Sequence, residues 1–160
     1  MPRVSVSAMK TLLHPNDKAE VLARLQSVHA TTPRCWGKMS AHQMVCHLAD
    51  GFRLYMSLKT AYPVPLPYPR IFLKWTALWA PIPWPKGYKT APELDQQTGG
   101  TPPAVFAADL RELQSLLDRF TRRPRDFEWR PHPHFGRMSD AEWMRLAYLH
   151  MDHHLRQFGA

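Results

Sequence analysis

Cysteine is scarce in this 160-residue chain, which contains only Cys35 and Cys46. Two cysteines cannot build a disulfide framework, and their separation excludes the CxxC spacing of thiolate zinc sites and redox motifs. The composition therefore fits a reducing compartment, and we expect a cytoplasmic protein.

Long apolar runs are also missing. The opening residues, MPRVSVSAMKTLLH, contain no apolar stretch of signal-peptide length. Nowhere does the chain approach the roughly 18 uncharged apolar residues of a membrane span. We expect neither export nor insertion into a membrane.

Acidic residues are few: 13 Asp and Glu stand against 21 Lys and Arg, giving a formal net charge of +8. Five arginines gather between residues 119 and 130, where they could contact phosphate. No nucleic-acid-binding motif accompanies them, and cations also complement the negative end of a helix dipole. We therefore expect a solvated helix end there and no nucleic-acid partner.

Core-forming residues are plentiful. Hydrophobic residues make up 44% of the chain and aromatic residues 11%, too many for a disordered protein despite the 16 prolines. The length suits one domain. We predict a single helical-bundle domain over residues 1–160.

Four stretches repeat apolar residues at helical spacing. They predict long helices over residues 17–29, 41–59, 102–121 and 140–158. Ser40 with Gln43 and Ser139 with Glu142 form capping boxes, and Thr101 followed by proline is the expected start of the third helix. No stretch shows the alternation of a strand, so the predicted fold class is all-α.

A proline- and aromatic-rich segment separates the second and third expected helices. Eight of the 16 prolines fall between residues 61 and 92, so no long regular element can form there. The stretch between Pro69 and Pro81 is free of proline and suits a short helix of about ten residues. The segment either caps one end of the bundle, which we favour, or forms a surface arm that contacts a partner or a membrane interface.

The C-terminal sequence YLHMDHHLRQFG places two histidines on an apolar helix face. At about 100° per residue, His154 lies roughly 40° from His150, on the side that carries Trp143. Buried imidazoles are costly unless their nitrogens are satisfied. Histidines at i and i+4 can bind one divalent ion, although Met151 stands where an HExxH protease has its glutamate.

A third ligand is available on the second expected helix. His47 lies at the centre of its apolar face, and Gly51, one turn further on, would let another helix approach closely. We predict that His47, His150 and His154 form a three-histidine metal site with open positions for water or substrate. The alternative is that these are hydrogen-bonded core residues. His153 lies at the border of its helix face and could replace or supplement a ligand.

Other candidates lie near these histidines in the sequence. Asp50, three residues after His47, either orients that imidazole or is a surface carboxylate. His132 and His134, in the loop PHPHFG, either line the mouth of the site or belong only to the loop. We expect His42 to be exposed. Cys46 is expected to act as a small apolar residue.

Two stretches, CWGKMSAHQMVCHLADGFR and PHPHFGRMSDAEWMRLAYLHMDHHLRQFG, resemble the DinB/YfiT-like superfamily of metal-dependent enzymes. The second is similar to a branch with an HPxFG-like loop and a terminal HxxHHxRQFG. The resemblance implies a four-helix bundle with one crossover connection, here with a Pro/aromatic-rich insertion between helices two and three. It also implies a divalent metal, nickel or zinc, held by His47, His150 and His154.

The better-understood relatives include thiol-dependent transferases and isomerases that use bacillithiol, mycothiol or glutathione. The resemblance thus implies that metal-activated water or a low-molecular-weight thiol attacks a small electrophilic substrate. This chain has HLRQ where the commoner ending is HRGQ, which leaves the reaction and the substrate open.

Two functions therefore compete at this point. One is a metal-dependent hydrolase or thiol S-transferase, and the other is a non-catalytic interaction module that uses the Pro/aromatic segment 62–88 as its contact surface. Bundles of this size often pair, and the apolar middle segment would suit the interface of a homodimer.

Overall fold

The computed structural model describes residues 9–63, 65 and 67–160. Within these residues the chain forms five α-helices, one 3-10 helix and no strand, which confirms the all-α prediction. In chain order the elements are α1 (Pro15–Gln26), α2 (Ala41–Tyr55), α3 (Arg70–Trp79), η1 (Pro92–Leu94), α4 (Phe106–Thr121) and α5 (Asp140–Gln157). None of the described helices is both long and apolar enough to cross a membrane.

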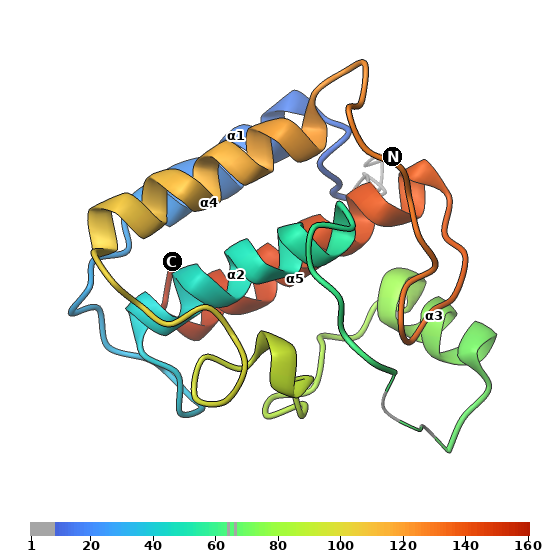
Figure 1. Ribbon diagram of the computed structural model, residues 1–160, viewed down its shortest axis with the longest axis horizontal. Helices are drawn as coiled ribbons and strands as arrows, with labels where there is room; N and C mark the ends of the chain where they lie inside the picture. Colours follow the sequence, from blue (N-terminus) through green and yellow to red (C-terminus); the bar gives the residue numbers. More distant parts are fainter. Residues whose placement is uncertain (1–8, 64, 66) are drawn as a thin grey trace, which may run out of the picture.

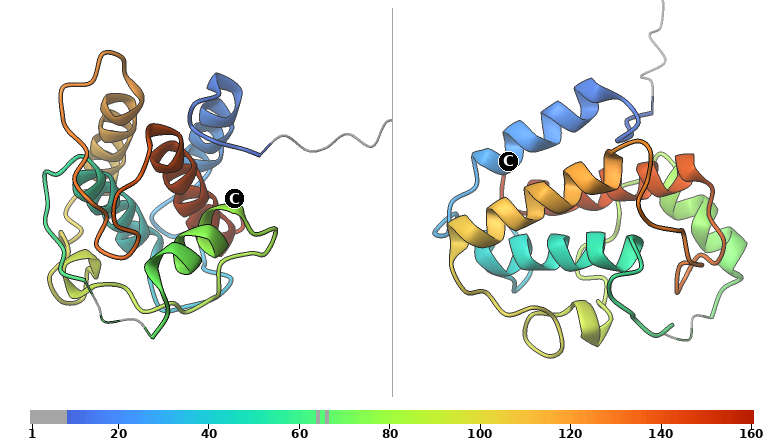
Figure 2. Two further views of the ribbon diagram at one scale, coloured as in Figure 1. Left: turned by 90° about the vertical axis from the view of Figure 1, so that its right-hand side faces the viewer. Right: turned by 45° about the horizontal axis from the view of Figure 1, so that its top comes forward.

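The four long helices α1, α2, α4 and α5 share one core (Figure 1). α2 contacts both α4 and α5, and α5 also contacts α1. Viewed from the end, α1 and α4 lie on the same side of the central pair α2 and α5 (Figure 2). The chain between α2 and α4, including α3 and η1, runs along the other side of this pair (Figure 1). The core draws fully buried side chains from each long helix, among them Leu25, Met44, Leu117 and Met151.

Both predicted capping boxes form. The amide of Gln43 donates to Ser40 Oγ at 3.1 Å, and that of Glu142 donates to Ser139 Oγ at 3.2 Å. The predicted starts of α2 and α5 are therefore confirmed. α2 ends at Tyr55 rather than near residue 59, because the chain turns at Ser57, whose φ is 63°.

Two other helix boundaries differ from the prediction. α1 covers Pro15–Gln26 instead of 17–29, with its proline in the first turn, where a missing amide costs nothing. The predicted start of the third long helix at Thr101 is wrong, since α4 begins at Phe106. The amide and the hydroxyl of Thr101 both donate to the carboxylate of Asp50, each at 2.7 Å, so this residue does not cap a helix.

The Pro/aromatic segment contains the short predicted helix, α3. Leu78 is buried, while Ile71, Phe72 and Trp75 are exposed. Further along, the indole of Trp84 is half-buried and donates to the carbonyl of Ala77 at 2.8 Å. The segment thus covers one side of the long helices and also presents an apolar surface.

Candidate metal centre

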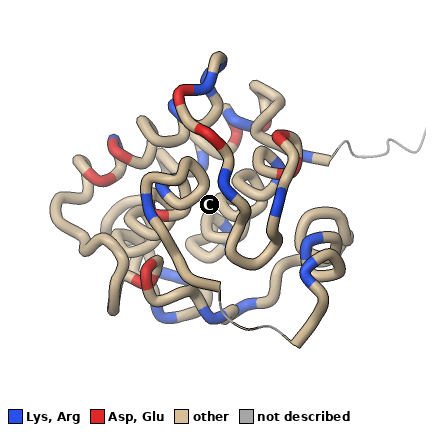
Figure 3. The backbone as a smooth tube through the Cα atoms, turned by 45° about the vertical axis from the view of Figure 1, so that its right-hand side comes forward, with Lys and Arg blue, Asp and Glu red and all other residues tan. Residues whose placement is uncertain are grey.

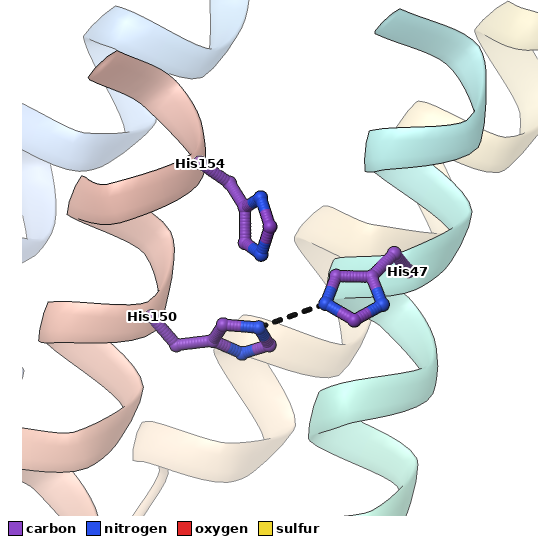
Figure 4. Close-up of side chains that lie close together, drawn as sticks. All are labelled: His47, His150 and His154. Atoms are coloured by element: carbon purple, nitrogen blue, oxygen red, sulfur yellow. Dashed lines mark hydrogen bonds between the residues drawn. The ribbon is translucent and has the colours of Figure 1, made fainter. Parts of the chain in front are cut away.

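α2 and α5 bring three histidines together from distant parts of the chain. His47 lies in the middle of α2, and His150 and His154 lie one turn apart on α5. Their ring centroids are 4.7 to 5.0 Å apart, and each pair of rings is inclined by 70° to 84°. One ring nitrogen from each lies within 4.8 Å of the others. The three rings point toward one centre (Figure 4), and this histidine cluster can hold a metal ion.

The close approach of the two helices depends on Gly51. A Cβ atom at this position would lie 3.0 Å from Cε1 and 3.1 Å from Nδ1 of His150. These distances are too short for an unshifted carbon contact. The role predicted for Gly51 therefore agrees with the structure.

The outer nitrogens of His47 and His154 are held by hydrogen-bond partners. Nδ1 of His47 donates to the carbonyl of Leu94 at 2.8 Å. Nδ1 of His154 lies 2.9 Å from Oε1 of Gln157, whose amide nitrogen donates to the carbonyl of Trp36. Because that amide nitrogen is the donor, Oε1 is the acceptor and His154 Nδ1 carries a proton. Both imidazoles therefore present an unprotonated Nε2 to the centre.

The two ring nitrogens of His150 contact His47 in the cluster and Tyr55 in the core. Its Nε2 lies 3.0 Å from Nε2 of His47, and its Nδ1 lies 2.9 Å from the hydroxyl of Tyr55. Since a neutral His47 accepts at Nε2, His150 donates there and accepts from Tyr55. With an ion in place of that proton, His150 Nδ1 would instead donate to the Tyr55 oxygen.

The separation of these two Nε2 atoms fits a shared ion. Their distance of 3.0 Å is that of a hydrogen bond, and two nitrogens this close could also bind one divalent ion.

Burial keeps the cluster neutral. His47 is only 3% exposed, and desolvation lowers its pKa below the ordinary value. Burial lowers the pKa values of His150 and His154 further, and the neighbouring imidazoles add to the effect. All three rings are therefore in the uncharged form that binds metal ions at neutral pH.

Two tryptophans form an aromatic wall beside the cluster. His153 stands outside the three-histidine group and lies between Trp36 and Trp84, with ring centroids 6.0 and 5.9 Å away. The Trp84 ring is also 6.2 Å from that of His150. Lys86 Nζ lies 4.6 Å from the centroid of Trp36. Helical periodicity could not identify either tryptophan as part of the site, because both lie in irregular segments.

Residues 7–160 match the family described as "Protein of unknown function (DUF1569)". The chain belongs to the DUF1569 family. No curated protein and no solved structure matches it. The function of this DUF1569 protein must therefore be argued from the site itself.

Asp50 neither binds the imidazole of His47 nor lies on the surface, so both predicted alternatives for it are wrong. It is 0% exposed, so it is not a surface carboxylate, and it makes no hydrogen bond to His47, whose Nδ1 is used by Leu94. Burial alone would raise the pKa of Asp50, but hydrogen bonds from Thr101 and Lys59 outweigh that effect and hold the pKa below its ordinary value. The carboxylate accepts from Arg53, Lys59, Gln96 and Thr101.

These bonds link Asp50 to the cluster indirectly. Gln96 and Thr101 follow η1 in the chain, and the last residue of η1 is Leu94, which supplies the carbonyl for His47. The buried carboxylate thus fixes the segment that orients this imidazole. Sequence reasoning missed Leu94, because a backbone carbonyl carries no signature in the side-chain pattern.

The loop histidine His132 packs one layer away from the cluster. It is buried against Tyr55 and Trp143, and its Nδ1 accepts from the amides of His134 and Phe135 at 3.1 and 3.3 Å. Burial lowers its pKa to about 3. These contacts give His132 a role in holding the loop.

The expectation that His42 is exposed is wrong. Its ring is half-buried and lies 2.6 Å from a carboxylate oxygen of Asp109, and Cys46 completes a second group of close ligand atoms. The same oxygen accepts from the amide of Ala104 at 3.0 Å. Burial raises the pKa of the Cys46 thiol to about 12, so the thiol stays protonated. Hydrogen bonds therefore explain why His42, Cys46 and Asp109 lie close together.

Proposed function

We propose that this DUF1569 protein is a divalent-metal-dependent enzyme of the DinB/YfiT-like type. Its four long helices suit the four-helix bundle of that superfamily. In the proposed reaction, water or a low-molecular-weight thiol attacks a small electrophilic substrate. The observation that carries the proposal is the convergence of three neutral imidazoles, one buried and two half-buried, each with a partner on its outer nitrogen.

His47, His150 and His154 would hold the ion through Nε2. Nickel or zinc suits a set of imidazole ligands. Such an ion, when bound, lowers the pKa of a coordinated water or thiol toward the neutral range. Three protein ligands leave positions open for nucleophile and substrate.

The surrounding residues have separate tasks in this proposal. Tyr55 orients His150, and the segment held by Asp50 orients His47. Trp84 covers His150 and limits access of bulk water.

Elemental analysis of tag-free protein tests the proposal. We expect one divalent ion per chain, and a higher melting temperature when nickel or zinc is added to metal-stripped protein. His150→Gln should abolish both effects. The matched control is His29→Gln, because His29 is exposed and lies outside the cluster. Protein that contains no metal and gains no stability from either ion would contradict the proposal.

A second candidate function is a non-catalytic interaction module. The exposed apolar side chains of the segment 62–88 favour it. A surface of this kind is compatible with an enzyme elsewhere on the chain. If the metal test fails while the segment still binds a partner, this second function replaces the first.

A further inference from the structure

One side of α3 presents large apolar side chains to solvent. Ile71, Phe72 and Trp75 are 76%, 57% and 56% exposed. At 100° per residue they share an arc of about 100°, with Trp75 one turn from both others. We call these three residues the α3 surface. Of the eleven large hydrophobic side chains exposed in the described residues, seven lie between 62 and 88, a concentration that marks a contact surface.

Other contacts of α3 hold it against α5. Leu78 is 1% exposed, and its carbonyl accepts from the guanidinium of Arg145 on α5 at 3.1 Å. Lys74 forms an ion pair of 2.9 Å with Glu142, also on α5. The helix is thus held to α5 while the α3 surface stays in solvent.

The segment of sequence that contains α3 carries charges of one sign, and Glu142 of α5, which lies against it, is paired with Lys74. Between Gly51 and Pro92 the sequence contains six Lys and Arg and no Asp or Glu. Figure 3 accordingly shows cations without acidic residues along α3 and the segments that flank it. Arg70, Lys86 and Lys89 are exposed and make no ion pair with the described carboxylates. Unpaired cations therefore accompany the exposed apolar side chains.

We propose that the α3 surface docks onto an anionic lipid bilayer. Aromatic and aliphatic side chains on one face of a short helix, with Lys and Arg nearby, are typical of segments that lie in the membrane interface. Phe72 and Trp75 would insert at the level of the headgroups, and Arg70, Lys86 and Lys89 would contact the anionic groups.

Charge argues against a second copy as the occupant. A two-fold interface would bring the unpaired cations of both copies together. An anionic bilayer neutralises them and also receives the apolar side chains. The proposal goes beyond the proposed function and requires no metal.

Vesicle flotation of the full chain tests it. We expect binding to phosphatidylcholine vesicles that contain about one-third phosphatidylglycerol, and weak binding to phosphatidylcholine alone. The triple variant Ile71→Ser/Phe72→Ser/Trp75→Ser should lower the partition coefficient about tenfold or more. Neutralising Arg70, Lys86 and Lys89 with glutamine should lower it about fivefold per charge.

Matched variants elsewhere serve as controls. Leu13→Ser/Val105→Ser changes exposed apolar residues outside the segment, and Lys38→Gln/Arg111→Gln/Arg130→Gln removes the same charge from other exposed positions. Both should bind like wild type, with circular dichroism and melting curves checking the fold of every variant. If the Lys38→Gln/Arg111→Gln/Arg130→Gln control loses as much vesicle binding as the variant at Arg70, Lys86 and Lys89, the attraction between protein and vesicle is non-specific. That result would overturn the proposal.

Other outcomes would also overturn it. One is the absence of binding to anionic vesicles. Another is a dimer in light scattering that the serine variant converts to monomer, without vesicle binding, which would assign the surface to a second copy. Binding to RNA but not to vesicles would assign it to nucleic acid.

Discussion

Asp50→Asn removes one negative charge from the core while keeping the shape of the side chain. In the wild type one carboxylate oxygen accepts from Arg53 and the hydroxyl of Thr101, and the other accepts from Lys59, Gln96 and the amide of Thr101. An asparagine must place its NH₂ group against one of these sets of donors. Either orientation therefore breaks hydrogen bonds and both ion pairs.

The size of the effect follows from burial. Removing one partner of a buried ion pair costs about 3–5 kcal/mol, because the other charge is left uncompensated. Here the side chains of Lys59 and Arg53 are 21% and 24% exposed and can regain water. We therefore expect the lower end of the range, about 3 kcal/mol in the free energy of unfolding.

Urea unfolding at pH 7 measures this loss. Asp118→Asn is the control, since Asp118 pairs with Lys18 but its side chain is 68% exposed. An exposed pair contributes about 1 kcal/mol or less. A loss for Asp50→Asn no larger than that of the control would refute the reasoning.

The same variant should weaken the metal site. Without Asp50 the segment that carries Leu94 is held less firmly, so His47 loses part of its orientation. Losing such outer support costs about tenfold or more in metal affinity. Competition with a chromophoric chelator measures it, with Asp118→Asn expected to match wild type.

Three further predictions concern the surroundings of the cluster. Gly51→Ala places a carbon 3.0 Å from the His150 ring, so it should displace that ring and weaken metal binding, and unchanged affinity would show that the helices separate freely. Tyr55→Phe removes only the hydroxyl that orients His150, so calorimetry should show metal affinity lower by about 10–100-fold. Because the folded pKa of His132 is about 3 against an ordinary 6.5, the unfolded chain binds its proton first, and stability falls as pH drops below 6.5. Urea unfolding at pH 5 should show a loss of about 2 kcal/mol from His132 alone, and a pH-independent stability between 7 and 5 would contradict this.

Local signals in the sequence predicted much of the helical framework. Ser40 and Ser139 cap α2 and α5 through bonds within one turn, so their spacing was sufficient. His150 and His154 are four residues apart, so helical periodicity was sufficient to place them on one face of a helix. To predict that His47 joins them, the apolar pattern of α2 was also needed, because it placed His47 on the face of that helix that packs in the core.

Features that depend on distant contacts could not be predicted. Thr101 is a good helix cap by type, yet the buried carboxylate of Asp50 binds both of its donors and moves the start of α4. Likewise, Gln157 orients His154 only because the carbonyl of Trp36 holds its amide. Neither pairing leaves a mark in local periodicity.

X-ray absorption spectroscopy on tag-free protein loaded with one equivalent of zinc or nickel would examine the histidine cluster most directly. We predict three imidazole nitrogens at about 2.0–2.1 Å from the ion, and loss of this signal in His150→Gln. An ion coordinated by sulfur or by a single imidazole, or no bound ion, would contradict a metal centre built from His47, His150 and His154.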